Sequence, residues 1–211
     1  MGPVWAIVLA AGSGSRFGFP KQFAELAGRR VVDWSVGTVR SACDEVVVVL
    51  PAGRAWDGPP VATTVPGGAS RSASVRAGLA AVPAGAEIIV VHDAARPLAP
   101  SALFAAVVSA VRSGADGAVP GLPVDDTLKR VDGDRVVATV ERDGLVAVQT
   151  PQAFRAAVLR AAHAGGGGAT DDAALVEAAG GKVVVVPGDR LNLKVTNPED
   201  LARAAWVMRE L

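Results

Sequence analysis

Short apolar runs that alternate with helix-like segments are the feature that most limits what this chain can fold into. Strand-sized runs lie within residues 4–9, 45–50 and 87–91, and their side chains are apolar almost throughout instead of at every second position. Such runs are typical of strands that are buried on both faces. Because these strands alternate with helical segments, we predict an α/β, Rossmann-like, mostly parallel sheet flanked by helices.

Element boundaries follow from the same pattern. We expect strands at residues 4–9, 45–50, 61–65, 87–91, 117–122 and 182–186. We expect helices at residues 31–39, 70–81, 101–112, 154–163 and 171–179, with a last helix that starts at Pro198. Ser101 and Thr170 are the expected N-caps of two of these helices, since a hydroxyl can accept a hydrogen bond from the open amides of a first turn.

Composition narrows the function classes. The chain has 211 residues, 50% of them hydrophobic, with 21 basic and 21 acidic residues, so it lacks the excess positive charge of a general nucleic-acid binder. Cys43 is the sole cysteine, which excludes an internal disulfide and a multi-cysteine zinc site. No apolar run approaches the ~20 residues of a membrane span, and no secretion signal is visible. We expect a cytoplasmic protein.

The alternation of buried strands and helices is interrupted between Val124 and Val148. Asp132-Gly133-Asp134 is a hairpin signal between two strand-like segments. We interpret residues 124–148 as a β-arm inserted into a single domain of residues 1–211. An arm of this size has no core of its own, so we expect it to pack on a second subunit and form a homodimer.

The segment from Val4 to Gln22 carries the first functional signal. An apolar run ends in Ala10, Ala11, Gly12 and Gly14, and the cations Arg16 and Lys21 follow. Small residues after a buried strand let backbone amides approach phosphates, and two cations suit a polyphosphate.

Two common kinds of phosphate loop do not fit this segment. No Gly-Lys-Ser/Thr follows at the spacing of a P-loop. A dinucleotide fingerprint needs a third glycine where Phe17 stands, and an acidic residue at the end of the second strand where Leu50 stands.

The pattern A-A-G-x-G-x-R-F followed by P-K-Q instead resembles the loop of nucleotidyltransferases that act on sugar or alditol phosphates. Six further segments match in chain order: residues 67–75 (GGASRSASV), 92–97 (HDAARP), 126–129 (DTLK), 140–144 (VERDG), 149–152 (QTPQ) and 192–196 (NLKVT). Together they resemble the 2-C-methyl-D-erythritol 4-phosphate cytidylyltransferase family over nearly the whole chain.

This resemblance implies a reaction. A phosphate oxygen of methylerythritol phosphate would attack the α-phosphorus of CTP, and pyrophosphate would leave. The products would be 4-diphosphocytidyl-2-C-methyl-D-erythritol and pyrophosphate, in the non-mevalonate route to isoprenoid precursors. The nucleophile is already an anion, so the enzyme must mainly position the substrates and stabilise charge. Arg16 and Lys21 would do this, with Mg²⁺ or another divalent cation held mainly by the CTP phosphates.

The resemblance also implies site residues. Those on the nucleotide side are Ala10, Ala11, Gly12, Gly14, Gly68, Arg71, Ser74 and Ala94, the last through its main-chain N–H to the ribose. Those on the acceptor side are Asp93, Thr127, Arg142, Thr170 and Lys194. Arg142 and Lys194 would also act on the reacting phosphates, and Arg142, being on the arm, would act in the partner's site. Some relatives have an acidic residue where Ala69 stands, which removes a side-chain role there.

The same residues allow two alternative functions. The acceptor could be ribitol phosphate or another alditol phosphate, because the residues on that side do not distinguish these compounds. A non-catalytic nucleotide-binding protein on the same fold is a second alternative, although the presence of both Arg16 and Lys21 speaks against it. Asp93 could instead cap a turn, and Thr170 could serve only as an N-cap. We interpret His92 and Arg96 as structural.

Overall fold

The computed structural model describes residues 2–14 and 17–210 of the chain. Within these residues, eight strands form one sheet in the order β10-β7-β11-β6-β1-β4-β5, with β12 also paired to β7. The strands are β1 (Val4–Leu9), β4 (Glu45–Leu50), β5 (Thr63–Pro66), β6 (Ile88–Asp93), β7 (Gly117–Pro123), β10 (Val146–Val148), β11 (Gln152–Arg155) and β12 (Val183–Pro187). Four of the pairings, β1 with β4, β1 with β6, β4 with β5 and β7 with β12, are parallel. The predicted mostly parallel α/β sheet is confirmed.

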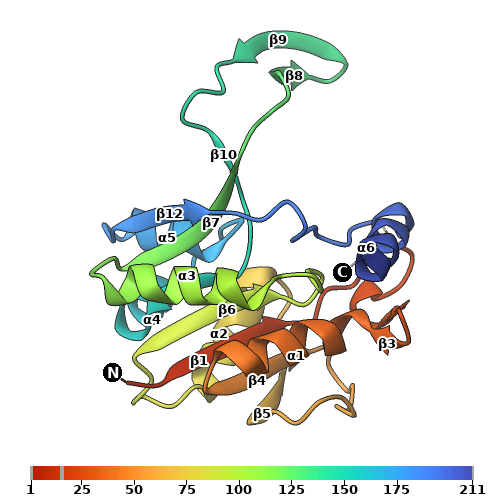
Figure 1. Ribbon diagram of the computed structural model, residues 1–211. Helices are drawn as coiled ribbons and strands as arrows, with labels where there is room; N and C mark the ends of the chain where they lie inside the picture. The colour runs from red at the N-terminus through yellow and green to blue at the C-terminus, as the bar shows by residue number, and fades with distance from the viewer. Residues whose placement is uncertain (1, 15–16, 211) are drawn as a thin grey trace.

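Helices cover both faces of this sheet (Figure 1). They are α1 (Val31–Ala42), α2 (Arg71–Ala81), α3 (Ser101–Arg112), α4 (Ala156–Ala164), α5 (Asp172–Ala178) and α6 (Pro198–Glu210). Successive residues of a strand point to opposite faces, and β1 shows the result. Val8 belongs to the core cluster with α1 and α3, whereas Ile7 belongs to the cluster with α2, α4 and α5. An unbroken apolar run is therefore what β1 needs.

Strand β11 was not predicted. The helix expected over residues 154–163 begins only at Ala156, and Gln152–Arg155 is a strand that runs antiparallel to both β6 and β7. Phe154 on this strand is 0% exposed. A four-residue strand directly before a helix has too few positions to show a period, so pairing in the folded sheet decides its structure.

The two predicted hydroxyl caps are also wrong. Pro100 holds the N-cap position of α3, without a side-chain cap bond, and Ser101 is the first residue inside the helix. Asp171 caps α5, because its carboxylate accepts a hydrogen bond from the amide of Ala174. Thr170 lies one residue outside that cap.

The inserted segment forms a two-stranded arm that projects from the body, as Figure 1 shows. It consists of β8 (Leu128–Asp132) and β9 (Arg135–Val140), joined by a turn in which Gly133 has φ of 58°. The returning strand β10 rejoins the main sheet beside β7. Val131 and Val136 on the arm are exposed, so the arm carries apolar side chains without a core of its own.

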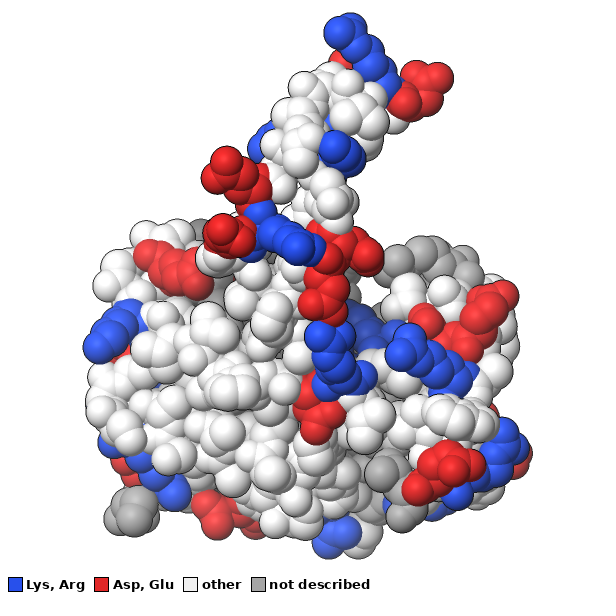
Figure 2. Space-filling view, turned by 45° about the horizontal axis from the view of Figure 1, so that its top comes forward, with Lys and Arg blue, Asp and Glu red and all other residues white. Residues whose placement is uncertain are grey.

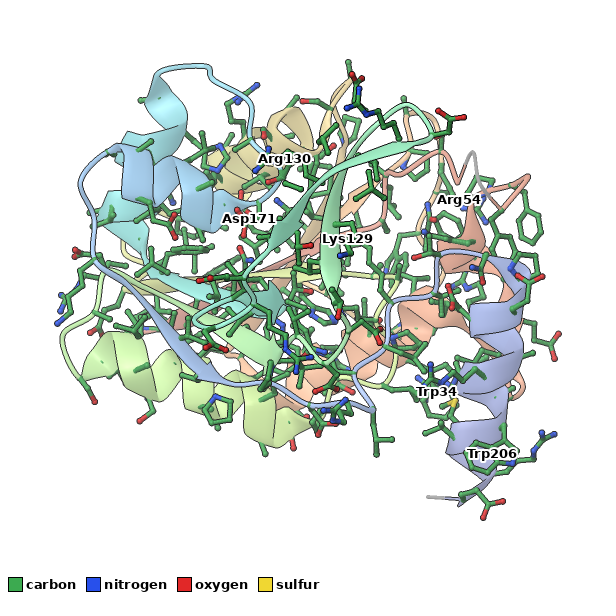
Figure 3. The ribbon with its side chains drawn as sticks, turned by 90° about the horizontal axis from the view of Figure 1, so that it is seen from above. Trp34, Arg54, Lys129, Arg130, Asp171 and Trp206 are labelled. Atoms are coloured by element: carbon green, nitrogen blue, oxygen red, sulfur yellow. The ribbon has the colours of Figure 1, made fainter. Side chains whose placement is uncertain are left out.

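Helix α6 covers a third apolar cluster that contains Leu26, Val31, Val195 and Ala204. Leu26 belongs to the hairpin β2 (Glu25–Leu26) and β3 (Arg29–Arg30), which follows the short 3-10 helix η1 (Lys21–Phe23). Figure 3 shows Trp34 beside α6, and Trp206 on this helix is 58% exposed. No helix in the described ranges is long and apolar enough to cross a membrane.

The buried ring of Phe154 gives a test of strand β11. We expect Phe154→Ala to lower the free energy of unfolding by about 3–5 kcal/mol, because it removes a large apolar side chain from the middle of the sheet. Phe19→Ala is the control, since Phe19 is half exposed, and should cost no more than about 1 kcal/mol. Denaturant unfolding of both variants provides the measurement. Equal losses would contradict a central position for β11.

Candidate active site

A cavity of about 490 Å³ opens at the carboxyl ends of β1 and β6. Leu9 and Asp93 end these strands and lie opposite each other in the sheet. The lining residues are Leu9, Ala11, Gly12, Ser13, Lys21, Gln22, Gly68, Ala69, Ser70, Arg71, Ser74, Asp93, Ala95 and Lys194. Cavities of about 330 and 570 Å³ lie elsewhere, both bordered by Asp44 at the amino end of the sheet. The cavity of about 490 Å³ differs from these in its lining, because glycine-containing loops and several charged side chains border it together.

Gln22 fixes the conformation of the first loop. Its side-chain amide donates to the carbonyls of Ala10 at 2.6 Å and Gly12 at 2.9 Å, and Gln22 itself is 3% exposed. Gly14 has φ of 69°, and a Cβ atom there would lie 1.9 Å from the Phe19 carbonyl oxygen. The loop therefore closes on itself, and glycine is required at position 14. Arg16 lies outside the described residues.

The loop before α2 forms the opposite wall of the cavity. Ser70 caps α2 by accepting a hydrogen bond from the Ala73 amide, and the hydroxyl of Ser74 accepts one from the Gly68 amide at 3.1 Å. A Cβ atom on Gly67 would lie 2.2 Å from the Cβ of Ala11. The two loops are therefore in close contact, and Gly67 makes that contact possible.

Asp93 is an acidic residue of the cavity wall. Its carboxylate accepts from Lys194 Nζ at 2.6 Å and from Arg71 Nε at 3.4 Å. Burial raises the pKa of this carboxyl, but Lys194 and Arg71 have the larger combined effect and hold the pKa well below its usual range. Asp93 is therefore an anion at neutral pH and accepts hydrogen bonds only.

Arg71 connects Asp93 to a second carboxylate. Its Nη1 donates to Asp172 at 2.8 Å, and Asp172 also bonds to His163 Nε2 at 3.0 Å. Burial lowers the pKa of Arg71, but the two carboxylates outweigh that effect and the net shift is upward. Lys194, Asp93, Arg71 and Asp172 thus form a row of alternating charges.

Behind Asp93, the strand end is held by a buried polar network. The Thr150 hydroxyl accepts from the Asp93 amide at 3.0 Å. The Arg96 carbonyl can only accept, so Nε2 of His92 donates to it at 3.3 Å. The other nitrogen of the neutral ring, Nδ1, then accepts from the Thr150 hydroxyl at 3.2 Å. Burial lowers the pKa of His92 from 6.5 to about 4, although the adjacent Asp93 acts in the opposite direction. His92 is therefore neutral at pH 7 and structural.

A family model described as "IspD: 2-C-methyl-D-erythritol 4-phosphate cytidylyltransferase" matches residues 4–210. The chain belongs to this family. A protein from Deinococcus radiodurans named 2-C-methyl-D-erythritol 4-phosphate cytidylyltransferase is 45% identical, and the match covers 94% of this chain and 87% of the relative. The crystal structure of the enzyme of that name from Thermus thermophilus superimposes with a TM-score of 0.85 at 37% identity, over 99% of this chain and 100% of that one.

Other relatives of this cytidylyltransferase family are longer. The bifunctional enzyme IspD/IspF of Clavibacter michiganensis is 47% identical over 94% of this chain, but the match covers only 52% of that protein. The chain spans about half the length of this and of the other bifunctional relatives that it matches, such as that of Ruegeria pomeroyi.

The cavity brings together most of the residues that were predicted to bind the nucleotide in this cytidylyltransferase-family chain. Two residues predicted to bind the acceptor also line it. The predicted residues that line it are Ala11, Gly12, Lys21, Gly68, Arg71, Ser74, Asp93 and Lys194. Ala10 and Ala94 are buried instead, and their backbone groups are used within the fold. The Ala94 amide already donates to the Leu9 carbonyl at 3.1 Å, so the structure leaves no unpaired N–H there for a ribose. The neighbouring Ala95 lines the cavity in its place.

Three predicted acceptor-side residues do not line this cavity. Thr127 and Thr170 are exposed and are not among its lining residues. Arg142 lies at the base of the arm, beside a separate cavity of about 480 Å³, where its guanidinium donates to the Asp125 carbonyl. Arg190 bonds to the Asp125 carboxylate at 2.7 Å. Figure 2 shows cations and carboxylates gathered where the arm joins the body.

Sequence reasoning assigned no role in the site to Gln22, Thr150 or Asp172; Asp172 was expected only to suit the positive end of its helix. Gln22 and Thr150 both lie in motifs that carry the family resemblance, P-K-Q and Q-T-P-Q. The motifs mark these residues, but they do not show which backbone and side-chain groups the two residues contact. Asp172 has no such signal, because its contacts with Arg71 and His163 form only when α5 packs in the folded chain.

The depressed pKa of His92 predicts a pH-dependent stability. As the pH falls, the unfolded chain binds a proton on His92 near pH 6.5, whereas the folded chain does so only near pH 4. Stability is therefore lost as the pH falls from 7 towards 4, by about 2 kcal/mol at pH 5 for this residue. His92→Gln should remove that part of the slope in denaturant unfolding. An unchanged slope between pH 7 and 5 would contradict the assignment.

Proposed function

We propose that this chain is a cytidylyltransferase that joins CTP and 2-C-methyl-D-erythritol 4-phosphate, giving 4-diphosphocytidyl-2-C-methyl-D-erythritol and pyrophosphate in the non-mevalonate isoprenoid pathway. The observation that carries the proposal is the shared cavity, in which the glycine loop and Lys21 face the α2 loop and the Asp93–Lys194 pair. A cytoplasmic location, expected from the sequence, is part of the proposal.

The proposed chemistry depends on positioning and charge. The attacking phosphate is an anion near neutral pH, so no general base is required, and His92 is buried and already paired on both ring nitrogens. Attack on the α-phosphorus builds negative charge on that group and on the departing pyrophosphate. Cations held in a partly enclosed site stabilise such charge at no reorganisation cost during the reaction. Lys21 has this role in our proposal, together with Arg16.

The nucleotide occupies the side formed by the two loops. Gly12 and Ser13 lie on the first loop, where backbone groups can approach the phosphates. The base lies against Gly68 and Ser74, whose mutual hydrogen bond fixes the backbone of the α2 loop. Recognition of cytosine then depends on backbone groups and on Ser74, since Ala69 has no polar side chain.

The acceptor occupies the side of Asp93 and Lys194. An ionised carboxylate accepts hydrogen bonds from sugar hydroxyls, and the Lys194 ammonium attracts a phosphate dianion. The 2.6 Å contact between them keeps both groups at the cavity wall before the substrate binds. The acceptor must therefore offer both hydroxyls and a phosphate.

Mg²⁺ enters the proposal as an ion held mainly by the CTP phosphates. Among the described residues, no group of three or more His, Cys, Asp and Glu side chains could hold a metal ion. Asp93 is the carboxylate on the described cavity wall that could add a ligand, and two cations already contact it. Mg²⁺ commonly uses one or two carboxylates together with substrate phosphates, so this wall fits such an ion. When bound, the ion neutralises phosphate charge.

The acceptor assay tests the proposal directly. Purified protein is mixed with CTP, Mg²⁺ and either methylerythritol phosphate or ribitol phosphate, and pyrophosphate release is recorded. We expect clear release with methylerythritol phosphate only. Release with ribitol phosphate alone would establish the alternative alditol-phosphate activity. Absence of release with every acceptor, although CTP binds, would instead indicate a non-catalytic nucleotide-binding protein.

Lys21 provides a mechanistic prediction. Lys21→Ala should reduce turnover at least ~10²-fold while CTP binding stays measurable by calorimetry, because the ammonium acts most strongly on the charge that develops during transfer. Lys182→Ala is the matched control, since Lys182 is exposed just before β12, and should keep normal turnover. Near-normal turnover of the Lys21 variant would refute the assigned role.

The arm provides a further prediction, which concerns a shared site. We propose that the chain forms a homodimer through the β-arm and that Arg142 contributes to the partner's site. Exposed valines on β8 and β9 support this arrangement, because they offer an apolar surface. Mixed dimers of Lys21→Ala and Arg142→Ala subunits should regain activity through one intact site. No recovery in hybrids verified by mass spectrometry would count against sharing.

A further inference from the structure

Asp172 is a buried carboxylate for which the proposed chemistry has no role. It lies at the start of α5 and is 0% exposed. One carboxylate oxygen accepts from Arg71 Nη1 at 2.8 Å, and the other contacts His163 Nε2 at 3.0 Å. A buried carboxylate is costly unless charged and hydrogen-bonding partners compensate it, and here both oxygens have a partner.

The contact with Asp172 is the stronger of the two that hold Arg71. The distance from Nη1 to Asp172 is 2.8 Å, as expected for a charge-assisted hydrogen bond, whereas the distance from Nε to Asp93 is 3.4 Å. The third nitrogen, Nη2, is shielded from solvent and has no hydrogen-bond partner among the described residues. The hydrogen bond to Asp172 of α5 is therefore the main contact that orients the Arg71 guanidinium.

The segment before α5 is attached to the same helix as Arg71. The Ser72 hydroxyl contacts the backbone of Ala169 on both its N–H and its carbonyl side, and Arg76 donates to the Gly167 carbonyl at 3.0 Å. With the Arg71–Asp172 bond, these contacts hold residues 167–172 along α2 at three points. The position of Asp172 relative to Arg71 is consequently well defined.

We propose that Asp172 is a positioning residue: held by His163, it orients the Arg71 guanidinium and, through Arg71, the Asp93 carboxylate at the cavity wall. This inference rests on the cytidylyl transfer proposed above. Asp93 lies between two cations, Lys194 and Arg71. Without its hydrogen bond to Asp172, the Arg71 guanidinium would interact with Asp93 alone. It would then draw the Asp93 carboxylate away from Lys194 and from the substrate.

The first test compares two adjacent aspartates. We expect Asp172→Asn to lower kcat/KM for both substrates by at least about tenfold, by analogy with the loss when the hydrogen-bond partner of a metal-ligating side chain is removed. Asp171→Asn is the matched control, because Asp171, labelled in Figure 3, caps the same helix. Its carboxylate contacts Gln152 and Ala174 instead of Arg71. Asn is also a good N-cap, so this variant should stay within about twofold of wild type.

A double-mutant cycle separates positioning from mere structure. In an Arg71→Met background, Asp172→Asn should cost nothing further in kcat/KM or in CTP affinity, because its effect acts through Arg71. A purely structural role would lower the thermal midpoint and add its loss in both backgrounds. Additive losses, or equal losses from Asp171→Asn, would overturn the proposal.

Two outcomes need separate treatment. If the wild-type protein releases no pyrophosphate with any acceptor, the proposed function fails, and the same cycle measured on CTP affinity by calorimetry decides the role of Asp172. If Asp172→Asn does not fold, His163→Leu replaces it, since it removes the second contact of the carboxylate. Its loss should likewise vanish in the Arg71→Met background, and persistence there would overturn the proposal.

Discussion

The burial of the Asp93 carboxylate is the constraint on which the rest of the site depends. A charged group at the end of a buried strand is tolerated only with cations nearby, and Lys194 and Arg71 supply them. These cations come from segments that are far apart in the chain. Asp93 therefore ties together β6, the start of α2 and the stretch before α6, and the same contacts that stabilise the fold also form the cavity wall.

The parallel sheet explains why these segments can meet. Its neighbouring parallel strands end at the same edge, so the loop after β1, the loop after β5 and the end of β6 converge there. Buried hydrogen bonds then fix each loop: Gln22 holds the first, Ser74 the second and Thr150 the strand end. The groups held by these bonds are in position before any substrate binds, which favours chemistry that depends on positioning.

Much of the fold could be predicted because its signals are local. Strand β1 follows from its unbroken apolar run, and the arm follows from its turn at Gly133. Strand β11 could not be predicted, since its identity comes from pairing with β6 and β7. The candidate site shows the same division. Lys21, Gly68 and Ser74 lie where the motifs placed them, at the cavity. The contact of Arg71 with Asp172 joins residues 101 positions apart, so only the folded chain reveals it.

The central claim is that this cavity transfers a cytidylyl group to an acceptor phosphate. Phosphorus NMR of the products formed from CTP and methylerythritol phosphate labelled with heavy oxygen in its phosphate group tests it most directly. If the acceptor oxygen attacks the α-phosphorus, the label will occupy the bridge of a new cytidine diphosphate diester, and the pyrophosphate will carry none. Label in the pyrophosphate, or release of CMP without any diester, would contradict the account.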